Sequence, residues 1–148
     1  MTASESATEN LVEIRDLHFA YGARKVLNGI DLSIQRGKVV AILGVSGCGK
    51  TTLLRLLGGQ IKPQSGSVKV AGQEVPALDA TDLYALRRDM GMMFQMGGLY
   101  SDMSVFDNVA FPMRELTDLS GQMIHDLVLM KLHAVGLRGT AAMMTGEL

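Results

Sequence analysis

The chain has 148 residues, of which 47% are hydrophobic and 20% are charged, so it can build a packed core and does not have the composition of a disordered chain. A net charge of −1 gives no electrostatic reason to expect nucleic acid or an anionic membrane surface as a direct partner. Its one cysteine, Cys48, excludes an internal disulfide bond and fits a reducing compartment.

The N-terminus and the apolar runs predict a cytoplasmic chain. Residues 1–10, MTASESATEN, are polar and have no apolar stretch after a basic one, so they do not form a secretory signal. The longest apolar run, residues 39–45, is far shorter than the ~20 residues that a membrane-spanning helix needs. We therefore expect any role at a membrane to come through a partner.

The first third of the chain predicts an antiparallel sheet after a loose tail at residues 1–10. In residues 11–22, apolar and charged side chains alternate imperfectly, which is typical of a half-exposed strand that ends at a glycine. Residues 25–37 alternate more regularly and predict a second antiparallel strand, broken near Asn28-Gly29.

The middle of the chain has a pattern typical of a parallel sheet between helices. Residues 38–44, KVVAILG, are apolar on both faces, which a strand tolerates only when both faces are covered. After a glycine-rich loop, a run of leucines predicts a helix that ends at Gly58-Gly59. The remaining predictions are a strand and turn at 65–75, a short helix at 79–90 with Asp79 and Asp82 at capping-box spacing, a second buried strand at 90–95, and helical patterns at 104–112 and 120–137.

The stretch Gly44-x-x-x-x-Gly49-Lys50-Thr51 matches the phosphate-binding P-loop pattern. Glycines allow successive backbone N–H groups to turn toward the phosphates, and the helix that begins near Gly49 adds unpaired N–H groups and the positive end of its dipole. The Lys50 ammonium can reach the β- and γ-phosphates, and the Thr51 hydroxyl can bind Mg²⁺. The sequence therefore predicts a site for a nucleoside triphosphate.

Cys48 lies inside this loop and has two interpretations. It is either a small residue whose backbone N–H group matters, or a thiol activated by the neighbouring amide dipoles and Lys50 and open to oxidation or alkylation. The sequence favours the first interpretation without excluding the second.

Three motifs in this order resemble the ATP-binding subunits of ABC transporters: LHFAYG at 17–22, GVSGCGKTTLLRLLGG at 44–59 and GMMFQ at 91–95. The resemblance runs from residue 11 to the end of the chain. It implies an α/β P-loop NTPase fold with an antiparallel β subdomain, an incomplete RecA-like core and the start of a helical subdomain. Residues 11–148 are then expected to be the N-terminal part of one ATP-binding domain.

The resemblance also implies roles for individual side chains. The aromatic ring of Tyr21 is expected to stack on adenine. Gln95 is expected to touch Mg²⁺ and the attacking water, and to begin a loop that bends toward a transmembrane partner. Lys50 and Gln95 are thus the expected catalytic residues, and Thr51 and Gln95 the expected metal-binding residues. The nucleotide is expected to be held by the whole loop, namely Gly44, Val45, Ser46, Gly47, Cys48, Gly49, Lys50, Thr51 and Thr52.

Two later segments resemble the subfamily that powers lipid transport with Mce-type partner proteins: MGGLYSDMSVFDNVAFPMREL and KLHAVGLRGTAAMMTGEL. This resemblance implies a homodimer of ATP-binding subunits that uses ATP and Mg²⁺ to drive transport of phospholipid or another lipid. The dimer would dock on a transmembrane permease at the inner face of the cytoplasmic membrane, with a Mce-type lipid-binding protein in the complex. No nucleic-acid partner is expected.

In the family, Leu148 would be the first residue of the signature motif, and the Walker B strand with its general base would follow. The 148 residues alone are expected to have little ATP turnover and poor solubility, because phosphoryl transfer needs the base and the opposing signature. Two alternatives stay open, a non-hydrolysing nucleotide-binding module and the ATPase subunit of an amino-acid-type importer. A small P-loop kinase is a weaker third, since Arg87-Arg88 is a slight hint of the arginine-bearing lid that it needs.

Overall fold

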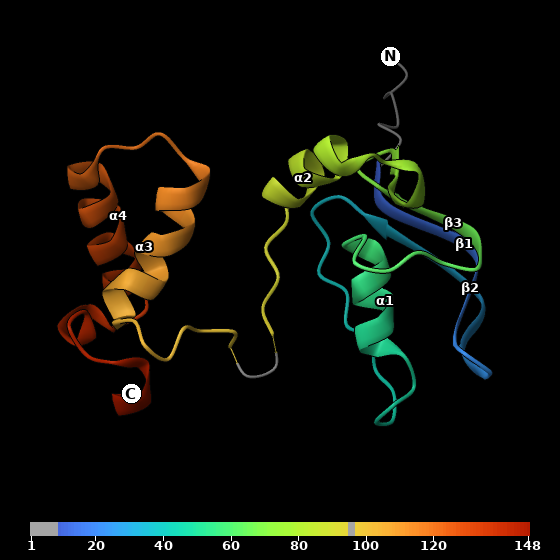
Figure 1. The fold of residues 1–148 in the computed structure, drawn as a ribbon, viewed down its shortest axis with the longest axis horizontal. Coiled ribbons are helices and arrows are strands. Elements are labelled where there is room, and N and C mark those ends of the chain that lie inside the picture. Colours follow the sequence, from blue (N-terminus) through green and yellow to red (C-terminus); the bar gives the residue numbers. More distant parts are fainter. Residues whose placement is uncertain (1–8, 95–96) are drawn as a thin grey trace, which may run out of the picture. The chain divides into compact units, whose positions relative to one another are not determined.

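The structure is a computed structural model that describes residues 9–94 and 97–148. The chain forms two compact units, Met1–Met90 and Gly91–Leu148. Figure 1 shows the helices and strands of each unit. Among the described residues, no helix is both long enough and apolar enough to cross a membrane.

The first unit contains a four-stranded antiparallel sheet with the strand order β2-β1-β3-β4. Its strands are β1 (Asn10–Tyr21), β2 (Arg24–Gln35), β3 (Ser65–Val70) and β4 (Gln73–Glu74). The hairpin of β1 and β2 confirms the two strands that the alternating pattern predicted, and β1 begins one residue earlier than expected. Gly22 has a φ of 57° in the tight turn that joins them, a backbone conformation that favours glycine.

The predicted break near Asn28-Gly29 is present as an irregularity in the β1–β2 ladder. Gly29 lies between two paired positions without a partner of its own and has a φ of 70°. On the neighbouring strand, Asp16 has a φ of 44°, and its carboxylate lies 2.9 Å from Nε2 of His18. Both strands therefore depart from regular geometry at the same level, which is typical of a β-bulge.

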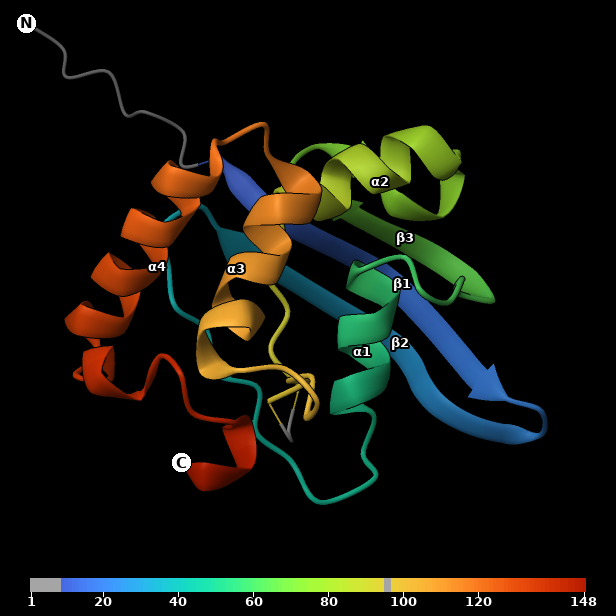
Figure 2. The same cartoon turned by 60° about the vertical axis from the view of Figure 1, so that its left-hand side comes forward.

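Helix α1 (Lys50–Leu57) packs against this sheet, as Figure 2 shows. The apolar cluster between them is built from one face of the helix and one face of the sheet, with Ile14, Leu17, Phe19, Leu27, Leu53, Leu56, Leu57, Val68 and Val70 among its buried side chains. The helix stops at Gly58-Gly59, as predicted. Gly59 has a φ of 65°, which favours glycine, and a Cβ atom there would come within 2.6 Å of Leu83 Cδ1 and displace that side chain.

Helix α2 (Ala80–Arg88) follows a 3₁₀ turn at Val75–Ala77. Its predicted N-cap is confirmed, because the Asp79 carboxylate accepts hydrogen bonds from the backbone N–H groups of Thr81 and Asp82 at 2.8 and 2.9 Å. At its other end, Arg87 Nε donates to the carbonyl oxygen of Gly58 at 2.8 Å. This bond ties the end of α2 to the end of α1.

Two predicted strands are absent from the described part of the chain. Residues 38–45 and 90–94 have no regular secondary structure and pair with no strand among the described residues, while Gln95 lies outside them. Side chains expected in a core are exposed, with relative solvent accessibilities of 102% for Val39, 89% for Leu43 and 88% for Met93. The prediction of two buried parallel strands is wrong here, because such strands need hydrogen-bonded neighbours and covering layers that the described residues do not supply.

The second unit is built on helices α3 (Val105–Leu116) and α4 (Gly121–Ala134). Their shared core consists of five buried side chains, Val105, Ala110, Ile124, Val128 and Leu132. The pattern predicted an end of the first helix at Pro112, but α3 continues through it. A proline removes one ladder hydrogen bond, and apolar packing on this cluster continues beyond it at Met113. Two 3₁₀ turns, Arg138–Thr140 and Thr145–Glu147, follow α4.

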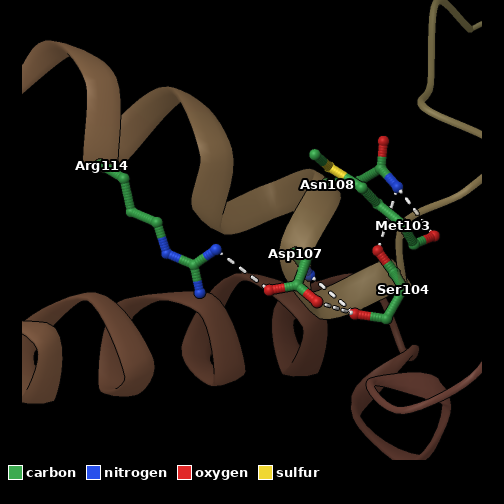
Figure 3. A network of polar contacts seen from close by, with 5 residues as sticks. All are labelled: Met103, Ser104, Asp107, Asn108 and Arg114. Carbon is green, nitrogen blue, oxygen red and sulfur yellow. Dashed lines mark hydrogen bonds and ion pairs between the residues drawn. The ribbon is translucent and has the colours of Figure 1, made fainter.

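A polar network fixes the start of α3 (Figure 3). Ser104 Oγ donates to Asp107 Oδ2 at 2.7 Å, and Arg114 Nη1 donates to Asp107 Oδ1 at 3.0 Å. These bonds hold the pKa of the Asp107 carboxyl below its ordinary value of 3.8, and the bond from Ser104 is the largest cause. The side chain of Asn108 holds the preceding loop through four hydrogen bonds, to the backbone N–H and carbonyl of Tyr100 and to the carbonyls of Met103 and Ser104.

Candidate nucleotide-binding site

The P-loop, residues 44–52, leads directly into α1. Gly47 and Gly49 have φ values of 78° and 105°, in the left-handed region that favours glycine. Between them, the N–H group of Cys48 donates to the carbonyl oxygen of Val45 at 3.3 Å and closes a turn. Gly49 is the N-cap of α1. The predicted tight turn into a helix is therefore present.

The N-terminus of α1 is suited to an anion. The first backbone N–H groups of any helix lack an intrahelical partner, and α1 has neither a side-chain cap nor an acidic residue in its first turn. Its positive dipole end is thus not neutralised from within the helix. Thr51 in this turn is exposed, whereas Thr52 is buried. Of the two threonines, Thr51 can present its hydroxyl to a ligand.

The Lys50 side chain folds back over the loop. Its Nζ donates to the carbonyl oxygens of Gly44 at 2.7 Å and Val45 at 2.9 Å, and lies 3.7 Å from Cys48 Sγ. The ammonium group therefore lies at the centre of the turn that the glycines create. Both carbonyls are neutral acceptors, so phosphate oxygens can replace them with stronger, charge-assisted hydrogen bonds.

Two glycines of the P-loop are required by close packing. A Cβ atom at Gly44 would lie 2.5 Å from Cys48 Sγ. A Cβ atom at Gly49 would lie 2.9 Å from Cγ1 of Val26 and 3.0 Å from Cδ2 of Leu27, both on β2. The loop is thus packed against β2 as well as against itself, which fixes its position relative to the hairpin.

The end of the hairpin brings Tyr21 toward the P-loop. Tyr21 is 47% exposed, and its ring packs edge-on against Phe19 with a centroid distance of 4.8 Å, so part of its surface remains open for stacking. Its partner across the turn is Arg24. The guanidinium Nη2 of Arg24 lies 3.6 Å from the position that a Cβ atom at Gly47 would occupy.

The structure brings most of the predicted site residues together. The loop residues, including the exposed Ser46, surround the N-terminus of α1, and Tyr21 is connected to them through Arg24. Gln95 lies outside the described residues. Sequence reasoning missed Arg24, because its place beside Gly47 follows from the register of the hairpin and the packing of β2, which no motif in the sequence gives. Cys48 is an exposed free thiol, which leaves both of its interpretations open.

A magnesium ion fits the donor that this loop offers. No group of three or more His, Cys, Asp or Glu side chains is arranged for a metal within residues 9–94 and 97–148. Mg²⁺ usually keeps several water ligands and is bound through phosphate oxygens with few protein donors. The exposed Thr51 hydroxyl in the first turn of α1 is compatible with that coordination.

Comparison with known proteins decides among the proteins that carry P-loops. A family model described as ABC transporter matches residues 27–146, which is most of the chain. The chain belongs to the ABC transporter family. This agrees with the resemblance drawn from its motifs.

Similar ABC proteins extend over most of this chain. It is 51% identical over 144 residues to the intermembrane phospholipid transport system ATP-binding protein MlaF of Escherichia coli (strain K12), covering 97% of this chain and 54% of that protein. It is 50% identical over 140 residues to MlaF of Haemophilus influenzae, covering 95% and 53%. The chain therefore spans about half the length of these relatives.

A solved structure with a similar fold is the dimeric ATP-binding cassette MJ0796 in a post-hydrolysis state bound to ADP and Pi. The TM-score is 0.80 at 28% sequence identity, and the match covers 93% of this chain and 62% of that chain. The ABC-type P-loop fold expected from the sequence is thereby confirmed, although the two buried strands of its core are not formed in the described residues.

Proposed function

We propose that this chain provides the nucleotide-binding part of an ATP-hydrolysing subunit that drives transport of phospholipid or another lipid. The observation that carries the proposal is the P-loop, in which Lys50 Nζ lies 2.7 Å from the Gly44 carbonyl at the uncapped N-terminus of α1. The lipid assignment is supported by the 51% identity to a phospholipid transport ATP-binding protein.

In this proposal the chain binds and orients the triphosphate. Backbone N–H groups of the loop and of the first turn of α1 surround the phosphates. Lys50 exchanges its carbonyl partners for oxygens of the β- and γ-phosphates, where it stabilises the charge that develops during transfer. The ring of Tyr21 stacks on adenine and fixes the other end of the nucleotide. Each contact restricts the γ-phosphate to one position, which favours in-line attack.

The proposed metal contacts complete the site. Mg²⁺, when bound, supplies positive charge to the β- and γ-phosphate oxygens. Thr51 is the proposed hydroxyl ligand, and Gln95 is the proposed contact to the metal and the attacking water. The proposed nucleotide contacts in the loop are Gly44, Val45, Ser46, Gly47, Cys48, Gly49, Lys50, Thr51 and Thr52.

The proposed assembly is a homodimer of ATP-binding subunits on a transmembrane permease, with a Mce-type lipid-binding protein in the complex. Support comes from the transport system named for MlaF and from the dimeric state of the solved cassette. The proposed location is the inner face of the cytoplasmic membrane, through the permease. Residues 11–148 are proposed to be the N-terminal part of one ATP-binding domain.

Calorimetry of the purified chain with ATP and Mg²⁺ tests nucleotide binding. We expect saturable binding that is lost in Lys50→Ala and retained in Lys62→Ala, because Lys62 is an exposed lysine outside the P-loop. Equal affinity in the two variants would contradict the proposed site. Binding without turnover, both in this chain and in the chimera below, would support a non-hydrolysing nucleotide-binding module instead.

A chimera tests the lipid assignment. This chain replaces the matching part of E. coli MlaF and is followed by the rest of that protein, and the purified transporter is assayed for phospholipid transport. We expect transport to be retained by the chimera and by its Lys62→Ala variant, and to be lost in its Lys50→Ala variant. A chimera that hydrolyses ATP but moves no phospholipid would overturn the lipid assignment while leaving the ATPase assignment intact.

A further inference from the structure

Arg24 is a cation beside the P-loop that the proposed function does not yet use. Its Nη2 lies 3.6 Å from the Cβ position of Gly47, which is the glycine at the turn of the loop. Val26, two residues further along β2, packs at the Cβ position of Gly49. Leu27 packs at the same position, so the start of β2, from Arg24 to Leu27, lies along the loop.

The position of Arg24 is fixed by the hairpin. Arg24 and Tyr21 are the last pair of the β1–β2 ladder, on either side of a tight turn. Directly paired residues project from the same face of a sheet, so the side chains of Arg24 and Tyr21 leave the hairpin on the same face. Lys25 pairs with Ala20, and the alternation of a strand turns its side chain to the opposite face.

The charge of Arg24 is not neutralised within the described residues. No ion pair or side-chain hydrogen bond joins its guanidinium to another residue among positions 9–94 and 97–148. A guanidinium stays protonated at any physiological pH and offers five donors in a fixed fork. An exposed cation held beside a phosphate-binding loop is therefore suited to an anionic ligand group.

We propose that Arg24 binds the α-phosphate of the nucleotide. This inference rests on the proposed function, in which Tyr21 takes the adenine and Lys50 takes the β- and γ-phosphates. Arg24 is beside Tyr21 in the ladder, and its tip reaches Gly47, so it lies between those two ends. The phosphate nearest to the adenosine is the α-phosphate. Arg24 thus adds a charge-assisted contact that is the same for tri-, di- and monophosphates.

Titrations with ATP, ADP, AMP and adenosine test the assignment. Arg24→Ala should weaken binding of the three phosphorylated ligands by a similar factor, about tenfold at low salt, and leave adenosine unchanged. The weakening should shrink as the salt concentration rises. Arg24→Lys should recover part of the loss, since it keeps the charge. Lys25→Ala is the matched control and should bind all four ligands as the wild-type chain does.

Three results separate this inference from the proposed function. If Arg24→Ala and Lys25→Ala bind ATP equally while Lys50→Ala does not, the inference about Arg24 is wrong and the proposed function stands. If Arg24→Ala weakens adenosine as much as ATP, Arg24 acts by holding Tyr21 and not by binding phosphate. A wild-type chain that binds no nucleotide, or a Lys50→Ala chain that binds normally, overturns both. Far-ultraviolet circular dichroism of each variant verifies that the chain is folded.

Discussion

Within the P-loop, the space available for a side chain at position 44 is limited by the side chain of Cys48. The Cβ position of Gly44 lies 2.5 Å from Cys48 Sγ but 3.8 Å from Cys48 Cβ. The first distance is a steric overlap and the second is an ordinary contact. A side chain at position 44 would therefore force the Cys48 sulfur to move, and Gly44 does not have the positive φ that would favour glycine by itself.

This dependence predicts a rescue. Gly44→Ala should weaken ATP binding by about tenfold or more, because relieving an overlap of this kind costs roughly 1–3 kcal/mol. Adding Cys48→Ala to the same chain removes the sulfur and should restore the affinity to that of the Cys48→Ala chain. Calorimetry on the three variants measures the effect. A double variant as weak as Gly44→Ala alone would show that the overlap is not the cause.

Asp107 gives the second unit a defined dependence on pH. Its folded-state pKa is lowered by the hydrogen bond from Ser104 and then by Arg114. A lowered carboxyl pKa contributes stability that is present above the ordinary value of 3.8 and is lost as the pH falls through the folded-state pKa. Asp107→Asn should therefore lower the free energy of unfolding at pH 7, on the order of 0.5 kcal/mol for so exposed a group, and change it little in acid. Urea titrations at both pH values measure this, and an equal loss at both would contradict it.

At the scale of elements, Asn108 joins α3 to the loop before it. Its side chain amide bonds backbone groups of three residues, Tyr100, Met103 and Ser104. A loop that carries this many bonds to one side chain depends on it for its local stability.

Asn108→Ala should free that loop without unfolding the helices. The amide of Tyr100, which donates to Asn108 Oδ1 at 2.8 Å, should exchange its hydrogen about tenfold faster, since the bond to Oδ1 and those beside it are lost together. Hydrogen exchange followed by NMR measures this. Gln122→Ala on α4, whose exposed amide bonds Asp126, is the control and should leave the exchange of Tyr100 unchanged. Equal rates in the two variants would contradict the role of Asn108.

Elements whose contacts are local were predictable from the sequence. The sequence signals for these elements, namely alternation, capping residues and terminal glycines, lie within a few residues of each element. The structure confirms the elements predicted from them: the β1–β2 hairpin, α1, α2 and α4. Residues 38–44 and 90–95 carry an equally clear apolar pattern, but a doubly covered strand depends on partners far away in the chain. The apolar pattern shows that such a segment needs to be buried. Whether it forms a strand depends on whether its distant partners are present.

In the candidate site, too, features that depend on local contacts were predictable and features that depend on distant contacts were not. The turn of the P-loop and the place of Lys50 in it were predictable because nine consecutive residues carry the pattern. Arg24 was not, because its place beside Gly47 depends on the register of a hairpin and on the packing of β2 against the loop. A spacing pattern carries no information about which strand lies against a loop.

At the scale of the whole molecule, the exposed apolar side chains at 38–45 and 90–94 favour self-association. Val39→Lys with Leu43→Lys should reduce association of this chain, as measured by light scattering, because both side chains are exposed and outside the proposed site. In the chimera with the rest of MlaF, the same changes should destabilise the protein by several kcal/mol if residues beyond Leu148 cover these positions. Equal tolerance in both proteins would show that the MlaF part of the chimera does not cover these side chains.

The hydrogen bond from Arg87 to Gly58 has a mechanical consequence. The P-loop lies at the N-terminal end of α1, and this hydrogen bond joins the C-terminal end of the helix to α2. Because a helix is stiff along its axis, a displacement of the P-loop end along that axis would have to lengthen or break the hydrogen bond between Arg87 and Gly58.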